Sequence, residues 1–315
     1  MAVKTSFGPE ELARILTGYD LGAYRHAGGI GQGTVQTNLL LETSEGRFVF
    51  RYYENRAWES VLFERDLLLY LGERDYPCPA PVPDRQGEYV GLYRDKPYVI
   101  FRFVEGHHVE HPGERHRAQL VRWAAELQKV TQGFHSPYTP HRWNYDPALC
   151  RRLARAEAAR LDTPAAREKL AWLEHETAAL ELPPSLPRGI CHCDFHFSNV
   201  LFHGDEFAAL IDFDDANRTF LPFDLVGLIE AWAWPHTSDA LDLAEARRVV
   251  QAYCEHRPLA PTEQWHLYDV YKLSILFDCV WFFSRWEGDG FYEKRKIEAL
   301  AGLGRQAFFE ALFGG

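Results

Sequence analysis

The sequence has few cysteines, no long apolar run and no excess of basic residues. Its 315 residues include only six cysteines, too few for a disulfide framework, and we expect them to be buried thiols in a reducing compartment. No apolar stretch reaches about 18 residues, the length needed for a membrane-spanning helix. Residues 1–19 also lack the basic and apolar regions of a secretion signal. These absences predict a cytoplasmic protein with no membrane contact.

Positive charge is scarce relative to negative charge. The chain has 34 Lys and Arg against 45 Asp and Glu, a formal net charge of −11 at pH 7. Proteins that coat nucleic acid usually carry the opposite balance, so we expect no nucleic-acid partner. With 46% hydrophobic and 25% charged residues the composition is that of a globular protein, and the length predicts about two domains or lobes.

The pattern of apolar residues divides the chain into a β-rich part and a helical part. In the first third, helices are expected over residues 9–16 and 58–71, and strands over 34–42, 47–53, 87–93 and 97–104. Later helices are expected over 115–130, 149–161, 164–180, 241–256, 263–285 and 292–312, with a loop-rich apolar block at 190–230. This order predicts an α+β fold, with a β-rich N-lobe at residues 1–104 and a larger helical C-lobe at 105–315.

Polar residues follow two apolar runs within that block. Asp194 follows the first run, with Asn199 five residues later, and Asp212 ends the second run at residues 208–211. Two carboxylates and an amide oxygen at strand ends suit Mg²⁺ that keeps some of its waters and binds phosphate oxygens. A carboxylate that does not bind the metal could accept a proton from a hydroxyl, which is the division of roles in phosphoryl transfer.

Other interpretations of the same block remain open. Asp and Asn are frequent in turns for local hydrogen-bonding reasons alone. Cys191, His192, Cys193 and His196 could form a zinc site, although the C-x-C spacing has no matching distal pair and alternate strand residues point to opposite faces. A metal-dependent phosphohydrolase would need more His and carboxylate ligands than the block offers.

A glycine-rich run precedes the first expected strand, with Gly28, Gly29, Gly31 and Gly33. Glycine N–H groups can approach phosphates closely when strands flank the loop, but a flexible loop has the same composition. Arg51 is expected on the strand face opposite Phe50 and Tyr52, and Glu64 on the following helix could pair with it. A solvated edge-strand arginine and an exposed helix glutamate are the alternatives.

These features occur in the order found in protein kinases, and their details resemble the aminoglycoside phosphotransferase and choline kinase superfamily. Residues 192–199 resemble its H-G-D-x-H-x-x-N motif, and residues 211–216 resemble its I-D-F-x-x-A motif. Residues 223–226 resemble the Y-D-L-A sequence that begins a helix in the superfamily. Within the superfamily the likeness is closest to ThrB-type homoserine kinases, on the stretches 19–22, 37–40, 46–49, 77–81 and 186–190. The resemblance covers residues 9–285 and implies a protein-kinase-like bilobal fold.

The resemblance also implies a role for each matching residue. Asp194 would be the catalytic base and His192 would brace its loop, while Asn199 and Asp212 would bind Mg²⁺ and Asp224 would be a structural anchor. The implied nucleotide-binding residues are Gly28, Gly29, Gly31 and Gly33 over the phosphates of ATP, Arg51 in the place of the usual lysine, Glu64 as its partner, and Phe101 and Phe103 in the adenine hinge.

The sequence therefore predicts an ATP- and Mg²⁺-dependent enzyme that phosphorylates a hydroxyl of a small molecule, with homoserine or a similar amino alcohol as the expected acceptor. Asp214 and Asp215 could complement the ammonium group of that acceptor, or form a turn in solvent. Choline, ethanolamine and aminoglycosides are alternative acceptors, because their kinases have an acidic residue after I-D-F where ThrB-type kinases tend to have an aromatic one. The alternative of another class is a nucleotide-binding pseudokinase that acts as an interaction module. A homodimer is compatible with the sequence.

Overall fold

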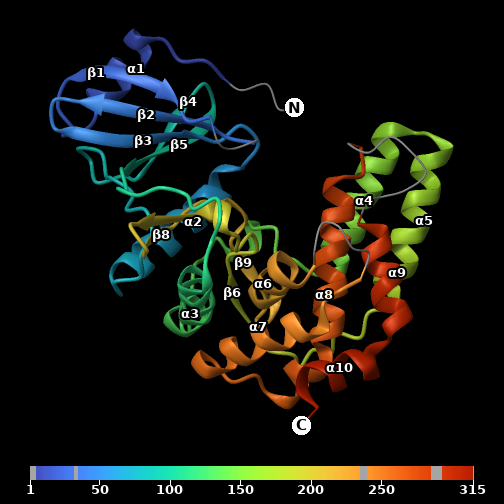
Figure 1. The fold of residues 1–315 in the computed structure, drawn as a ribbon. Helices are drawn as coiled ribbons and strands as arrows, with labels where there is room; N and C mark the ends of the chain where they lie inside the picture. Colours follow the sequence, from blue (N-terminus) through green and yellow to red (C-terminus); the bar gives the residue numbers. More distant parts are fainter. Residues whose placement is uncertain (1–4, 32–34, 235–239, 285–292, 315) are drawn as a thin grey trace. The chain divides into compact units, whose positions relative to one another are not determined.

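The structure is a computed structural model that describes residues 5–31, 35–234, 240–284 and 293–314 (Figure 1). The chain divides into two compact units. The first consists of Met1–Glu110, Gly133–Arg142 and Ser198–Asp214, and the second of His111–Gln132, Trp143–Phe197 and Asp215–Gly315. A β-rich first unit and a mainly helical second unit agree with the predicted α+β class. The expected division of roles at residue 104 stays a prediction.

The first unit contains an antiparallel five-stranded sheet in the order β1-β2-β3-β5-β4 (Figure 1). Its strands are β1 (Tyr24–Gly29), β2 (Thr37–Thr43), β3 (Gly46–Tyr52), β4 (Val90–Tyr93) and β5 (Lys96–Arg102). Phe48, Phe50 and Tyr52 of β3 are buried in one apolar cluster with residues of helix α1 (Pro9–Leu16). Because side chains alternate along a strand, Arg51 is left on the opposite face of β3, as predicted.

Strand β1 is the element of this sheet that the sequence did not predict. It pairs only with β2, at the edge of the sheet, and none of its residues is buried. Since no buried face selects its residues, the segment shows no alternation of apolar and polar positions. Gly28 and Gly29 consequently lie in the ladder, opposite Leu40 and Leu39.

A helix and a hairpin complete the first unit. Helix α2 (Trp58–Gly72) confirms the helix expected there. The hairpin of β7 (Val200–His203) and β8 (Glu206–Leu210) lies beside the segment that follows β5, because the N–H groups of His107 and Phe202 each donate to the other residue's carbonyl oxygen at 2.9 Å. The short helical turns of this region are η1 (Thr139–His141), η2 (Phe197–Asn199) and η3 (Phe213–Asp215).

The second unit is mainly helical, with one short antiparallel strand pair, β6 (Arg188–Cys191) and β9 (Asn217–Phe220). Its described helices are α3 (Glu114–Val130), α4 (Pro147–Leu161), α5 (Pro164–Ala178), α6 (Phe223–Ala233), α7 (Leu243–His256), α8 (Pro261–Trp281), α9 (Lys294–Leu303) and α10 (Arg305–Phe313). Helices α4 and α5 each begin with proline after a side-chain cap, Asp146 and Thr163 respectively. This cap starts α4 two residues before the predicted position, because proline suits the first helical position.

The prediction of a single helix over residues 292–312 is wrong, because Gly304 separates α9 from α10. Gly304 has φ 78° and ψ 154°, a conformation that is essentially restricted to glycine. Glycine at this point ends α9 and starts α10 in a new direction.

Two absences noted in the sequence can be compared with the structure. None of the described helices is long and apolar enough to cross a membrane. All six cysteines are free thiols, and Cys150, Cys191 and Cys279 are buried while the other three are partly exposed. The expectation of buried thiols is therefore confirmed for half of them.

Gly302 and Gly304 provide a matched pair of substitutions at the end of α9. A Cβ atom built at either position would have no atom within 4 Å, so crowding is equal and the backbone conformation decides the outcome. We expect Gly304→Ala to lower the free energy of unfolding by about 1–3 kcal/mol, and Gly302→Ala in the helix to raise it by about 0.5–1 kcal/mol. Urea unfolding of both variants checks this, and changes of the same sign would contradict it.

Candidate functional site

Asp224 holds the backbone that immediately precedes Asp194. It lies buried in the first turn of α6, where its Oδ2 accepts the N–H of His192 and its Oδ1 accepts the N–H of Cys193, both at 2.9 Å. Burial raises the pKa of the Asp224 carboxyl, although His192 and these two hydrogen bonds oppose the change. Strand β6 ends at Cys191, so Asp194 follows directly on an anchored turn.

The turn before Asp194 has a backbone shape that glycine usually adopts. Cys193 has a φ of 65°, and the H-G-D motif of the superfamily has glycine at this position. The side-chain amide of Asn217, which is fully buried, donates to Cys193 Sγ at 3.2 Å. A non-glycine residue held in this conformation is typical of turns that carry function.

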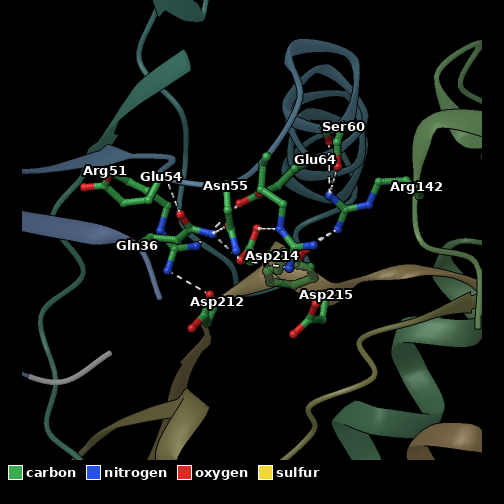
Figure 2. Close-up of polar contacts among 12 residues, drawn as sticks. Gln36, Arg51, Glu54, Asn55, Ser60, Glu64, Arg142, Asp212, Asp214 and Asp215 are labelled. Atoms are coloured by element: carbon green, nitrogen blue, oxygen red, sulfur yellow. Dashed lines mark hydrogen bonds and ion pairs between the residues drawn. The ribbon is translucent and has the colours of Figure 1, made fainter. Parts of the chain in front are cut away.

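Arg51 joins two carboxylates in the first unit (Figure 2). Its Nη2 lies 2.7 Å from Asp212 Oδ1, its Nη1 lies 3.7 Å from Glu64 Oε1, and its Nε donates to Asn38 Oδ1 at 3.0 Å. Arg51, Glu64 and Asp212 come from β3, α2 and the segment after β8, so the structure brings together a pair that the sequence suggested and a third position that it singled out separately.

Burial and charge act against each other in this group. Burial disfavours the charged form of Arg51, but the nearby carboxylates, Asp212 first among them, outweigh it and raise the pKa of the guanidinium further. Burial raises the pKa of the Glu64 carboxyl to about 7, and Arg51 offsets this only in part. Arg51 therefore stays protonated at every pH at which the protein is folded, while Glu64 can change its charge near neutral pH.

Asn199 and Asp212 lie on neighbouring segments of the first unit. The N–H of Ile211 donates to the carbonyl oxygen of Asn199 at 2.8 Å, immediately before Asp212, whose side chain is 35% exposed. Two oxygen donors of this kind fit Mg²⁺, which takes few protein ligands and completes its shell with phosphate and water.

The zinc alternative is wrong. Within the described part of the chain, no group of three or more His, Cys, Asp or Glu side chains is placed to hold a metal ion. Cys191, His192, Cys193 and His196 all lie in that part, so the C-x-C spacing reflects one cysteine at the end of β6 and one in the turn that follows, and not a metal site.

The carboxylate of Asp214 is buried and accepts hydrogen bonds from two side chains. Arg56 donates from Nε to Asp214 Oδ1 at 2.8 Å and from Nη2 to Oδ2 at 3.1 Å, and Gln36 Nε2 donates to Oδ2 at 2.8 Å. Burial opposes the negative charge, but Arg56 outweighs it and keeps the pKa of Asp214 below its ordinary value. The alternative of a turn in solvent is therefore wrong for Asp214, which forms an internal ion pair with Arg56, and its role in acceptor binding stays a prediction. Asp215 belongs to the second unit, and its role in acceptor binding stays a prediction.

The expected phosphate-covering glycines are only partly described. Gly28 and Gly29 lie in β1, and Gly31 follows shortly after that strand. Gly33 lies outside the described residues. Their role in nucleotide binding stays a prediction.

The expected adenine hinge follows β5. Phe101 is a β5 residue that pairs with Val49 of β3. Phe103 comes just after the strand, its N–H donates to the carbonyl oxygen of Arg47 at 3.4 Å, and the Arg47 guanidinium lies 4.3 Å from the centroid of its ring. The segment is thus fixed to the sheet, as a hinge requires, and its contact with adenine stays a prediction.

Sequence reasoning missed three residues around this group, Gln36, Arg56 and Arg142. Arg142 is buried at the end of η1, far along the sequence from any motif, and it donates to the carbonyl oxygens of Phe213 and Asp214. Gln36 lies in a predicted strand and the two arginines lie outside any motif, so the sequence carries no signal that separates the three from ordinary polar residues.

Comparison with known proteins decides the family. A profile described as the phosphotransferase enzyme family matches residues 26–265. The chain belongs to the phosphotransferase enzyme family.

Two relatives of this phosphotransferase are named homoserine kinase. The one from Parvibaculum lavamentivorans is 33% identical over 279 residues, and the one from Rhodospirillum rubrum is 36% identical over 268 residues; each match covers 84% of this chain and 81% of the relative.

A solved structure shows the same fold. An amicoumacin kinase in complex with AMP-PNP and Ca²⁺ matches this phosphotransferase with a TM-score of 0.70 and 13% identity, over 96% of this chain and 94% of that one. The family match and this structural likeness confirm the predicted superfamily resemblance, the kinase-like α+β fold and the prediction of a phosphotransferase enzyme.

The raised pKa of Glu64 predicts how stability depends on pH. Because the folded-state pKa of about 7 lies above the ordinary value of 4.5, the folded protein takes up a proton between these values. The stabilisation linked to this proton is complete below the unfolded pKa and is lost as the pH rises through 7. We expect Glu64→Gln to remove this loss, which amounts to about 3 kcal/mol at most.

Thermal unfolding between about pH 5 and 8 measures the effect. The melting temperature of the wild type should fall more steeply over this interval than that of Glu64→Gln. Glu73→Gln is the control, because Glu73 follows the same helix and its side chain is 73% exposed. Parallel pH profiles for the wild type and Glu64→Gln would contradict the assignment.

Proposed function

We propose that this protein is a homoserine kinase, which transfers the γ-phosphoryl group of ATP to the hydroxyl of homoserine. The observation that carries the proposal is the name shared by relatives that are 33% and 36% identical over 84% of this chain. The expected cytoplasmic location stays a prediction that suits an enzyme of small-molecule metabolism.

The proposed reaction gives a role to each residue that matches the motifs of the superfamily. The hydroxyl oxygen of the acceptor attacks the γ-phosphorus, its proton passes to a carboxylate oxygen of Asp194, and the bond from the γ-phosphorus to the oxygen of ADP breaks. Arg51 would bind phosphate oxygens through its planar guanidinium fork, and Glu64 would hold that fork in place. Asn199 and Asp212 would hold Mg²⁺, which neutralises charge on the phosphates when it is bound.

The position of Asp214 bears on the choice of acceptor. An acidic residue after I-D-F was the feature that favoured choline, ethanolamine or aminoglycoside acceptors. Since the Asp214 carboxylate is buried against Arg56, its charge is neutralised within the first unit and gives no reason to prefer a more cationic acceptor. Homoserine therefore remains the best-supported acceptor.

An ATP-consumption screen tests the acceptor. Homoserine, choline, ethanolamine and one aminoglycoside are compared at equal concentrations, with Mg²⁺ present. We expect turnover with homoserine to exceed the others by at least about tenfold, in line with the discrimination that polar contacts in a site provide. Preference for another acceptor would refute homoserine, and ATP binding without turnover on any acceptor would support a pseudokinase.

Asp194→Asn tests the catalytic assignment. The substitution keeps the shape of the side chain but removes the proton acceptor and its charge. We expect kcat to fall by roughly 10²-fold or more, while ATP affinity measured by calorimetry changes little, because the base contributes little to holding the nucleotide. Asp205→Asn, in the exposed turn between β7 and β8, is the matched control and should leave both quantities unchanged. Undiminished turnover in Asp194→Asn would exclude Asp194 as the base.

A further inference from the structure

The segment that carries Asp212 has a backbone conformation that the sequence alone would not maintain. Asp212 has a φ of 65°, in the left-handed region, which non-glycine residues occupy rarely although aspartate tolerates it better than most. Ile211 is fixed to Asn199 on the preceding side, as described above. The side chain of Asp212 is held by Arg51, and the residues that follow Asp212 are held by separate contacts.

Arg142 provides these contacts (Figure 2). Its Nη2 donates to the carbonyl oxygens of Phe213 at 3.1 Å and Asp214 at 2.6 Å. Its Nη1 donates to the carbonyl oxygen of Ser60 at 3.1 Å and to Ser60 Oγ at 2.9 Å. Arg142 is only 6% exposed. One guanidinium thus ties the two residues after Asp212 to the first turn of α2, the helix that carries Glu64.

Arg56 fixes the same segment through a side chain. Its bonds to both oxygens of Asp214 leave that residue little freedom to rotate, and Gln36 adds a third bond. Gln36 is itself held by the N–H of Glu54, which donates to Gln36 Oε1 at 2.7 Å, and by Asn55, whose Oδ1 accepts from Gln36 Nε2 at 2.9 Å. The backbone and the side chain of Asp214 are therefore both fixed by groups outside its own segment.

We propose that Arg142 and Arg56 are positioning residues, which hold Asp212 in the left-handed conformation in which its carboxylate faces Arg51 and can bind the Mg²⁺ of Mg·ATP. Arg142 acts on the backbone through the carbonyl groups of Phe213 and Asp214. Arg56 acts through the Asp214 carboxylate. This inference rests on the proposed function only in taking Asp212 as a metal ligand, and it does not depend on the acceptor.

Arg142→Lys tests the proposal, because an ammonium group cannot bond four acceptors in the plane that a guanidinium spans. Calorimetry measures ATP affinity with EDTA and then with increasing Mg²⁺. We expect ATP affinity in EDTA to stay within about twofold of the wild type, since Arg51 is intact, and the Mg²⁺ concentration for half-maximal effect to rise at least about tenfold, because Asp212 is no longer held.

Two arginines serve as matched controls. Arg85→Lys replaces an arginine that also donates to a carboxylate, Asp20, and to a carbonyl oxygen, that of Thr17, but has a 54% exposed side chain. Arg257→Lys replaces an arginine of the second unit that pairs with Glu263 and has a 13% exposed side chain, and it reports the effect of losing a paired guanidinium on stability alone. Neither control should change the Mg²⁺ response.

The outcomes are distinct. A lower melting temperature in Arg142→Lys with an unchanged Mg²⁺ response would mean a purely structural role and would overturn the proposal. A wild type whose ATP affinity does not respond to Mg²⁺ would also overturn it. If Arg142→Lys does not fold, Arg56→Lys is used instead. For this variant we expect the Mg²⁺ concentration for half-maximal effect to rise at least about threefold, and a smaller rise would overturn the proposal. The binding measurement contains no acceptor. If the wild type fails to phosphorylate homoserine, the proposed function is refuted but the measurement of Mg²⁺ response remains valid.

Discussion

Buried charge that must be compensated within the protein organises the first unit. Arg51, Arg56 and Arg142 lie among Glu64, Asp212 and Asp214, and each guanidinium has acceptors within hydrogen-bond or ion-pair distance. All of these side chains except that of Asp212, which is 35% exposed, are largely buried. Charges in such a place are tolerated only when they are paired, and removing one partner typically costs about 3–5 kcal/mol. The requirement for pairing therefore fixes β3, α2 and the segment after β8 as one arrangement.

The two units hold the aspartates of the proposed site, Asp212 and Asp194, in opposite ways. In the first unit a cation, Arg142, binds the carbonyl groups of the residues that follow Asp212. In the second an anion, Asp224, binds the amide groups of the two residues that precede Asp194. In both cases the turn is held through its backbone by a side chain from another segment. The backbone next to each aspartate is thus held by groups other than its own carboxylate.

Most of the fold and part of the site could be predicted from the sequence. The alternation of Phe48, Phe50 and Tyr52 placed Arg51 on the correct face, and helical spacing located α2 almost to the residue, because periodic burial leaves a periodic pattern. Edge strand β1 and the break at Gly304 were missed, since neither depends on such a pattern. Arg142 could not have been found, because its role depends on four acceptors distant in sequence that only the folded chain brings together.

The arginine at position 51 has a consequence for chemical labelling. A lysine in the nucleotide site of a kinase presents an amine, which acylating nucleotide analogues can modify when it loses its proton. The guanidinium of Arg51 keeps its proton, and the surrounding carboxylates raise its pKa further, so it offers no nucleophile to such reagents. On the proposed role of Arg51, a survey that detects kinases by acylation of the lysine at this position would not detect this enzyme through it.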